Sequence, residues 1–414
     1  MITLPFLFLS SIFRNVNIMS ASEETLGVAA RLARKNILEL QPYRCARDDY
    51  SDGVLLDANE NAYGPAAAKN THTLERYPDP YQVPLKEKLC AYRGNGLKPV
   101  NVFVGVGSDE AIDLLMRIFC RPGQDKILQT PPTYGMYKVC AKVNDVEIVN
   151  VPLTPDFSLR IPEVSVEAVL YYHIRCWFSN VRMSHIHSSP LNTCSCQILD
   201  AVTPEVKLLF LCSPGNPTSK ALPIEDIVTI AESEKYSGIV VVDEAYVDFS
   251  AKGSAVTLVN KYPNVVVLQT LSKAFGLAAI RCGFCIGAPD VIQLMNNVKA
   301  PYNINAMTSE MATAAFDNIH VLDANIKNLL EQRVLVAAEL EKLDFVTKVY
   351  PSDSNFVLFR LREKAQLAYK TMADGGVVTR FRGAEIHCNE CIRVTLGTPK
   401  ENQAFLGALK MFYR

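Results

Sequence analysis

The sequence predicts an α/β fold, in which a mainly parallel sheet is sandwiched by helices and a smaller α+β domain follows. From Val54 onward, short apolar runs alternate with helical patterns, and this order is typical of parallel sheets. The runs are apolar along their whole length, as expected for strands that are buried on both faces. With 414 residues, the chain is long enough for two or three domains.

The first clear strand is predicted at Val102–Val106. It leads through Gly105 and Gly107 into a helix from Asp109, where apolar residues recur at helical spacing. Helical patterns such as Pro223–Lys235 lie between several of the later strands. Those strands are expected at Lys126–Gln129, Glu147–Val151, Lys207–Cys212, Ile239–Val242, Val265–Gln269 and Gly283–Ile286.

The pattern changes after Pro301. One long amphipathic helix is predicted at Met307–Lys342. Short strands then follow at Val346–Tyr350, Phe356–Arg360 and Cys391–Leu396, with a helix at each end of the group. With a hinge near Ala300–Pro301, the expected parts are a disordered N-terminal extension (1–19), an N-terminal arm that completes the small domain (20–75), a large domain (76–300) and a small C-terminal domain (301–414).

The charges of the chain are nearly balanced, with 42 Lys and Arg against 43 Asp and Glu. The chain has no surplus of basic residues that would indicate a nucleic-acid or membrane partner. A small anionic substrate would therefore need locally placed cations. The twelve cysteines are scattered through apolar segments and indicate reduced thiols in a cytoplasmic protein. Two C-x-x-C pairs, Cys282–Cys285 and Cys388–Cys391, have the spacing of zinc ligands. About a hundred residues separate the pairs, and we expect no metal.

Two segments do not fit the pattern. Residues 2–13 are apolar but shorter than the ~20 residues of a membrane span, and they lack the basic start of a signal peptide. We interpret them as an upstream extension or a misplaced start, with a targeting segment as the alternative. Residues 171–198 contain no acid, Lys or Gly, whereas the flanking sequence would join as helix, turn and strand. We expect this insertion to lie outside the packed fold without a catalytic role, either as a translated intron or as a lineage-specific loop.

The strongest chemical signal is T-L-S-K-A-F-G-L-A-A-I-R, which directly follows a predicted strand. Loss of water around the Lys273 ammonium would lower its pKa and make it a usable Schiff-base nucleophile. Thr270 and Ser272 place hydroxyl groups beside it, and the forked guanidinium of Arg281 matches a phosphate. Taken alone, the segment also fits a surface Ser-Lys turn.

A second signal is V-V-V-D-E-A-Y. Asp243 ends an apolar strand and is therefore expected at the carboxyl edge of the sheet, where open α/β folds bind ligands. A carboxylate there can keep a pyridine nitrogen protonated, and Tyr246 can donate to a phenolate oxygen. The alternative is an ordinary acidic pair at a helix start.

Two further segments follow strands. C-S-P-G-N-P-T-S predicts a rigid turn that aims Asn216 at a polar ring atom, although it also fits an ordinary β-turn. V-G-V-G-S-D-E-A leaves the backbone N–H groups of Ser108 and Asp109 available to an anion at a helix start. Its glycine spacing is not that of a Rossmann fold, and no P-loop lysine follows. Nearby, P-P-T-Y-G-M-Y supplies Tyr134, an aromatic ring that can stack on a flat cofactor.

Together these motifs resemble the fold-type I PLP-dependent aminotransferases, and within them the histidinol-phosphate aminotransferase family. The resemblance runs from about Asn36 to the C-terminus, apart from 171–198. It is carried by L-D-A-N-E-N-A-Y-G-P, R-Y-P-D, G-S-D-E and I-R-V-T-L-G-T. The family often has Pro in place of Ala62 and Gly in place of Ser219, and neither position supplies chemistry.

The resemblance implies pyridoxal 5'-phosphate (PLP) as the cofactor, held as a Schiff base on Lys273. It implies Asp243 at the pyridine nitrogen, Tyr246 and Asn216 at the ring oxygen, and Tyr134 stacked on the ring. The phosphate ligands would be the backbone of Ser108 and Asp109, the side chains of Thr270, Ser272 and Arg281, and Tyr77 from the neighbouring subunit. Asn59, Arg380 and Arg393 would bind substrate, with Arg393 on the carboxylate of glutamate or 2-oxoglutarate.

The reaction implied is reversible transamination between L-histidinol phosphate and 2-oxoglutarate in histidine biosynthesis, catalysed by a homodimer with shared active sites. One alternative is another fold-type I enzyme, such as an aromatic aminotransferase or a phospho-amino-acid decarboxylase. Arg380 together with Arg393 argues for a substrate with an extra anion. The other alternative is a non-catalytic PLP-binding regulator, but the sequence before the resemblance is too short for a DNA-binding module.

Overall fold

The computed structural model describes residues 27–41, 58, 74–160 and 197–413. Its larger sheet has the strand order β1-β7-β6-β5-β4-β2-β3. Neighbouring strands from β6 through β5, β4 and β2 to β3 are parallel, whereas β7 runs antiparallel to both β1 and β6. The prediction of a mainly parallel sheet is confirmed. The strands are β1 (Val102–Val106), β2 (Lys126–Gln129), β3 (Glu147–Asn150), β4 (Val206–Cys212), β5 (Ile239–Asp243), β6 (Val265–Thr270) and β7 (Cys282–Ile286).

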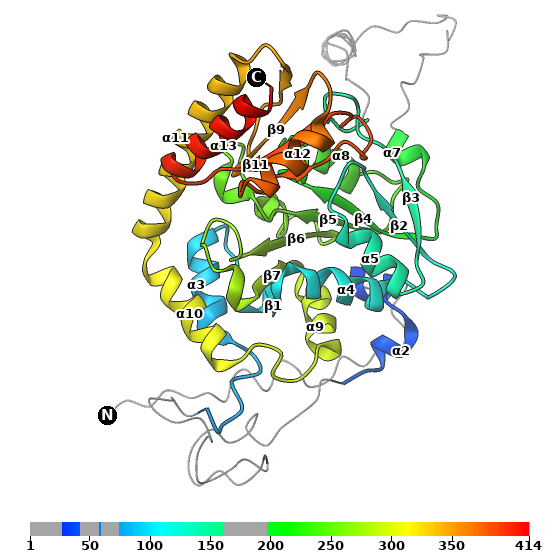
Figure 1. Cartoon of the computed structure of the whole chain (residues 1–414). Helices are drawn as coiled ribbons and strands as arrows, with labels where there is room; N and C mark the ends of the chain where they lie inside the picture. Colours follow the sequence, from blue (N-terminus) through cyan, green and yellow to red (C-terminus); the bar gives the residue numbers. More distant parts are fainter. Residues whose placement is uncertain (1–26, 42–57, 59–73, 161–196, 414) are drawn as a thin grey trace, which may run out of the picture.

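Helices cover both faces of this sheet (Figure 1). Successive residues of a strand point to opposite faces, so Val240 packs in one apolar cluster and Val241 in the other. The first cluster includes residues of α3 (Val83–Arg93), α7 (Gln197–Asp200), α8 (Ile224–Ala231) and α10 (Ala306–Asp317). The second includes residues of α1 (Val28–Leu32), α2 (Lys35–Leu38), α4 (Gly107–Phe119), α5 (Met136–Val143) and α9 (Pro289–Val298).

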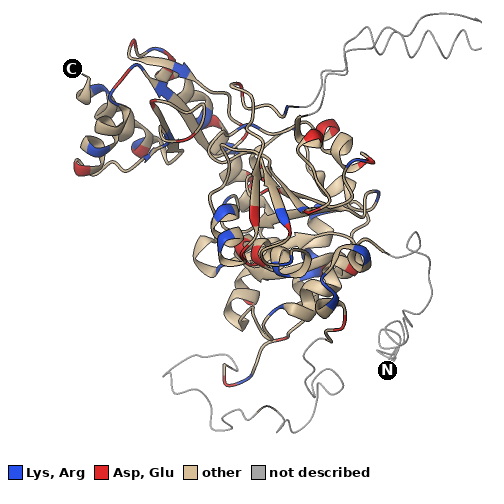
Figure 2. Ribbon diagram, turned by 90° about the vertical axis from the view of Figure 1, so that its right-hand side faces the viewer, with Lys and Arg blue, Asp and Glu red and all other residues tan. Residues whose placement is uncertain are grey.

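The smaller sheet is antiparallel, with the order β10-β11-β9-β8. Its apolar residues pack with α11, α12 and α13 in a cluster of their own. In Figure 2 this C-terminal part projects to the upper left of the body that carries the larger sheet. The elements are α11 (Ile319–Glu341), β8 (Val346–Val349), β9 (Phe356–Leu361), α12 (Ala365–Asp374), β10 (Arg380–Phe381), β11 (Cys391–Thr395) and α13 (Pro399–Phe412), of which α12 and β10 were not predicted.

The single long helix predicted at Met307–Lys342 is wrong, because two helices occupy the segment. Asn318 separates α10 from α11 with φ −116° and ψ 38°, which is outside the helical region. Its side-chain Nδ2 donates to the carbonyl of Ala314 at 2.8 Å. Asn competes with the helix for backbone hydrogen bonds in this way, and the chain changes direction between the larger and the smaller sheet.

Two predicted boundaries differ from the structure. The described part of the N-terminal arm packs on α9 beside the larger sheet through Val28, Ala29 and Ile37, and not on the small domain. Of the 171–198 insertion, residues 171–196 lie outside the described residues, but Ile198 is fully buried in α7. The backbone N–H of Gln197 donates to the carbonyl of Arg160 at 3.1 Å. The packed fold therefore resumes two residues earlier than predicted. The predicted extension 1–19 also lies outside the described residues.

Charged residues of both signs are spread over the ribbon in Figure 2, in keeping with the balanced composition. Within the described ranges, no helix is both long and apolar enough to span a membrane.

Candidate active site

The predicted chemical residues converge at one edge of the larger sheet. Strands β4, β5 and β6 are parallel neighbours, so their carboxyl ends lie side by side. Asp243 is the last residue of β5, Lys273 follows β6, and Asn216 follows β4. Because β7 is antiparallel to both β1 and β6, β1 also ends at this edge and delivers the start of α4. The sheet topology thus brings together motifs that are more than 160 residues apart in sequence.

The start of α4 lies close to Arg281 because two glycines leave room. Gly107 has φ +70°, and a Cβ on it would lie 2.5 Å from Nη2 of Arg281. A Cβ on Gly283 of β7 would overlap the backbone of Gly107 and Ser108. Arg281 itself has φ 52°, and its carbonyl accepts from the N–H of Gly107 at 3.0 Å. This close approach places a guanidinium against the positive end of a 13-residue helix, which is an arrangement suited to an anion.

Hydroxyl groups complete the predicted phosphate cradle. The hydroxyl of Thr270 donates to Oγ of Ser272 at 2.9 Å, and Nη1 of Arg281 lies 3.4 Å from the same Oγ. Nη2 of Arg281 donates to Oδ2 of Asp109 at 3.1 Å, while the Tyr134 hydroxyl donates to Oδ1 at 3.1 Å. The Asp109 carboxylate is therefore compensated, and it fixes the positions of both Arg281 and Tyr134.

Lys273 lies next to this cradle. Its Nζ is 5.4 Å from the centroid of the Tyr246 ring. The side chain keeps an exposed surface. Nevertheless, protein atoms around the ammonium lower its pKa by desolvation, and the nearby charges of Arg393 and Arg281 lower it further. A lysine of this kind is more often neutral, and hence more nucleophilic, than a surface lysine.

Asp243 is almost completely buried, with 2% of its surface exposed. Burial raises its pKa to about 6, against the opposing effect of two hydrogen bonds. The Tyr137 hydroxyl donates to Oδ2 at 2.7 Å, and the N–H of Ala245 donates to Oδ1 at 3.2 Å. Sequence reasoning chose Tyr134 from P-P-T-Y-G-M-Y and missed Tyr137, although Tyr137 is the residue that orients this carboxylate.

Tyr246 is buried, and desolvation raises its pKa to about 12. It therefore stays protonated at neutral pH and can donate a hydrogen bond. Its ring packs edge-on against Phe356 of the smaller sheet, with centroids 5.1 Å apart. Tyr246 thus lies where the two sheets meet.

Arginines from the smaller sheet also reach this edge. Oδ1 of Asn216 accepts from Nη1 of Arg393 at 2.5 Å and from Nη2 of Arg382 at 2.9 Å. Arg380 pairs with Arg393 across β10 and β11, so both side chains are on the same face of that sheet. Arg382 was not predicted. Its spacing of two residues from Arg380 in R-F-R is the signal that places it on the same face.

The remaining predicted residues have different outcomes. Tyr77 is described, 51% exposed, and its ring stacks on Tyr302 with centroids 4.6 Å apart. Asn59 lies outside the described residues. In the described part of the chain, no group of three or more His, Cys, Asp or Glu side chains is arranged to hold a metal.

The gathered residues fit PLP by their chemistry. An arginine, two hydroxyl groups and a helix start match a phosphate, a buried carboxylate matches a ring nitrogen, and a protonated tyrosine matches a ring oxygen. The Nε atoms of Arg382 and Arg393 are buried and have no hydrogen-bond partner among the described residues. This edge therefore has donors that the described part of the chain does not satisfy, as expected of an anion site.

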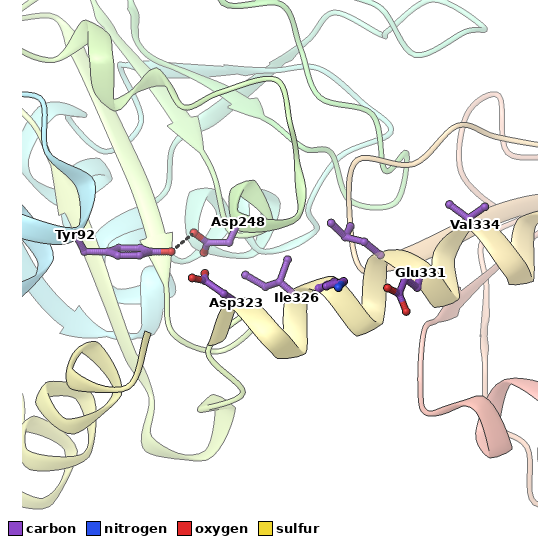
Figure 3. Close-up of a pocket in the computed structure, with 8 residues that line it drawn as sticks. Tyr92, Asp248, Asp323, Ile326, Glu331 and Val334 are labelled. Carbon is purple, nitrogen blue, oxygen red and sulfur yellow. Dashed lines mark hydrogen bonds between the residues drawn. The ribbon is translucent and has the colours of Figure 1, made fainter. Parts of the chain in front are cut away.

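A separate groove of about 520 Å³ lies along α11, as Figure 3 shows. Tyr92 and Asp248 line it, and the Tyr92 hydroxyl lies 3.4 Å from Oδ1 of Asp248. The Asp248 carboxylate is already paired with Arg93 at 2.6 Å. None of the predicted chemical residues lines this groove, so it is distinct from the candidate active site.

Comparisons with known proteins bear on this site. The family model for aminotransferase class I and II matches residues 49–409. The chain is 45% identical over 399 residues to histidinol-phosphate aminotransferase of Schizosaccharomyces pombe, covering 91% of this chain and 96% of the relative. It is 41% identical over 394 residues to the Saccharomyces cerevisiae protein of the same name, covering 90% and 94%.

Solved structures share the fold. Histidinol-phosphate aminotransferase from Clostridium acetobutylicum aligns with a TM-score of 0.66 at 22% identity, over 82% of this chain and 91% of the other. The Sinorhizobium meliloti protein, solved in complex with pyridoxal-5'-phosphate, aligns with a TM-score of 0.65 at 21% identity, over 86% and 90%. At these identities the likeness shows the fold alone, and the fold agrees with the sheet order described above.

Proposed function

The chain belongs to the aminotransferase class I and II family, and on that basis we propose that it transfers the amino group of L-histidinol phosphate to 2-oxoglutarate in histidine biosynthesis. It is a PLP-dependent aminotransferase. The observation that carries the substrate assignment is the 45% identity to a histidinol-phosphate aminotransferase across almost the whole of both chains. The products are imidazole-acetol phosphate and glutamate.

We assign the following residues to the parts of the cofactor. Lys273 holds it covalently, Asp243 faces the ring nitrogen, and Tyr246 and Asn216 face the ring oxygen. Ser108, Asp109, Thr270, Ser272 and Arg281 surround the phosphate, and Tyr134 covers the ring. When bound, PLP supplies a protonated ring that withdraws electrons from the substrate Cα.

The protein's part in the reaction follows from these positions. Asp243 keeps a proton on the ring nitrogen, because a buried carboxylate without a cation is costly. With the cofactor bound, the amine of the substrate would replace the amine of Lys273 on the same cofactor carbon, and this exchange would free Lys273. Its neutral amine would then take the proton from the substrate Cα and return it to the cofactor carbon on the other side of the linking nitrogen, first as a general base and then as a general acid. The lowered pKa of Lys273 favours this neutral form.

We assign two anion contacts to the substrates. Arg393 binds the carboxylate of glutamate or 2-oxoglutarate, and Arg380 binds the phosphate of histidinol phosphate. The register of β10 and β11 supports this assignment, since it puts both side chains on one face of the smaller sheet, and Arg393 on that face contacts Asn216. Asn59 is assigned to the substrate on sequence resemblance alone.

The test of this function compares three amino donors: histidinol phosphate, histidinol and phenylalanine. Arg380→Ala should lower kcat/KM for histidinol phosphate by about 30-fold or more, because a charge-assisted contact worth about 2–5 kcal/mol is lost. It should change the value for histidinol by less than about threefold. Steady-state kinetics with 2-oxoglutarate as acceptor measures both values. Equal losses on both donors would reject the phosphate contact, and a wild-type preference for phenylalanine would reject the substrate.

We also propose a homodimer with shared active sites, working in the cytoplasm. Support comes from two large side chains that stay exposed on the single subunit. Tyr77 is about half exposed, and Met307 is 60% exposed. A cavity of about 400 Å³ lies beside them, lined by residues 74–78 and 305–307. In a dimer, Tyr77 reaches the cofactor phosphate of the partner.

Subunit mixing tests the shared site. A Tyr77→Phe subunit impairs the active site of its partner, because Tyr77 completes the partner's site. A Lys273→Ala subunit inactivates the active site that it carries itself. A heterodimer of the two variants contains one site with both changes and one site with neither. Mixtures should therefore recover up to about a quarter of wild-type activity, since about half of the dimers are mixed. Activity that stays at the average of the parents after verified subunit exchange counts against the shared site.

A further inference from the structure

The Asn216 carboxamide is held by two guanidinium groups rather than one. Its Oδ1 accepts from Arg393 at 2.5 Å and from Arg382 at 2.9 Å, and the residue is 7% exposed. A carboxamide has its acceptor on one side and its NH₂ donor on the other. Cationic donors that fix Oδ1 therefore also fix the direction in which Nδ2 donates.

Arg382 is held firmly for this purpose. Nη1 of Arg382 donates to Oε1 of Glu385 at 2.8 Å, and its backbone N–H donates to the carbonyl of Cys391 at 2.8 Å. The Arg382 and Glu385 side chains are only 19% and 28% exposed. One guanidinium thus spans a carboxylate of its own segment and the carboxamide of Asn216, 166 residues away.

Arg393 is held differently. Its guanidinium lies 5.0 Å from the centroid of the Phe356 ring, and its Nε is buried without a hydrogen-bond partner in the described ranges. Burial and the nearby charge of Arg382 both lower its pKa, so an incoming anion relieves an unfavourable environment. A substrate carboxylate on Arg393 competes with Oδ1 of Asn216 for the same N–H groups.

We propose that Arg382, braced by Glu385, is a positioning residue that, together with Arg393, keeps Nδ2 of Asn216 directed at the cofactor ring oxygen. This inference rests on the proposed placement of Asn216 at that oxygen. A donor on the ring oxygen withdraws negative charge from it. The oxygen then interacts less strongly with the proton on the nitrogen that links the ring to Lys273, and the pKa of that nitrogen is lower. Losing the donor should raise the pH at which that proton leaves.

The experiment follows the visible absorption of the holoenzyme as a function of pH. Arg382→Met should raise the pH midpoint of the absorption change by about half a unit to one unit, the size expected of one hydrogen bond. Glu385→Gln should shift it less, in the same direction. Arg382→Lys, which keeps the charge and one donor, should restore part of the shift. Arg362→Met, at an exposed arginine just beyond β9, is the matched control and should leave the midpoint unchanged.

A double-mutant cycle separates positioning from simple charge. Removing a positive charge would by itself raise the midpoint, because its repulsion of the protonated nitrogen is lost, and that part should persist in an Asn216→Ala background. If Arg382 acts through Asn216, more than half of its shift disappears in that background. An equal shift in both backgrounds overturns the inference. So does an unchanged midpoint with a raised KM for histidinol phosphate, which would make Arg382 a substrate ligand. A wild-type protein with no cofactor absorption would instead contradict the proposed function.

Discussion

Lys273→Ala should lower kcat by at least about 10⁴-fold, the largest effect expected of any single substitution in this protein. The variant loses a general acid and base, a role worth about 10²–10⁴-fold, together with the nucleophile that holds the cofactor. Added methylamine should restore part of the rate, because a small amine can enter the space left by the side chain and move the same proton. Single-turnover measurements with histidinol phosphate determine the loss and the recovery.

Lys86→Met is the matched control for this prediction. Lys86 is 6% exposed, and burial lowers its pKa to about 8, so it is also a desolvated lysine. It lies on α3, a helix that holds none of the residues assigned to the cofactor. Its replacement should leave kcat within about threefold of wild type. A comparable loss in the two variants would show that the position of Lys273 at the sheet edge has no special role.

Asp243→Asn should lower kcat by about 10³-fold, because the carboxylate that keeps the ring nitrogen protonated is replaced by a neutral group. The same change should stabilise the cofactor-free protein at neutral pH. The unfolded carboxyl ionises near pH 4, whereas burial raises the folded pKa to about 6. Unfolding therefore releases a proton between those pH values, and this group's contribution to stability falls as pH rises through that window.

The stability gain of Asp243→Asn should consequently be larger at pH 7 than at pH 5. It should reach about 1–3 kcal/mol above pH 6, reduced to the extent that the new amide lacks a partner beside Tyr137. Urea unfolding of the apoproteins at the two pH values measures it, and Tyr137→Phe is a useful companion variant. A destabilised Asp243→Asn protein with near-normal kcat would contradict both the burial argument and the assigned role.

The strands of the larger sheet were predictable because most of them are short, buried apolar runs. β1 and β2 have the predicted bounds, and β5 and β6 extend one residue further, to Asp243 and Thr270. Those two residues form hydrogen bonds at the sheet edge, and such bonds cannot be predicted from the local pattern of hydrophobic residues. The break at Asn318 was missed for a related reason, since apolar periodicity continues across it.

The site was predictable motif by motif, but its supporting contacts were not. Tyr134 and Tyr137 are three residues apart in one aromatic segment, and only the packing of α5 against β5 decides which one meets Asp243. Arg382 is likewise selected by the meeting of the smaller sheet with the turn after β4. Contacts between segments more than a hundred residues apart depend on tertiary structure, and a single sequence does not encode them in local spacing.

Borohydride reduction of the holoenzyme, followed by peptide mapping, tests the central assignment most directly. Reduction converts the link between lysine and cofactor into a stable amine that survives proteolysis. We expect the pyridoxyl group on the peptide that contains Lys273, at close to one per subunit. Label on Lys86 or Lys299, the other lysines in the described ranges whose pKa burial lowers, or no label on a protein that binds PLP, would contradict the assignment of Lys273 as the cofactor lysine.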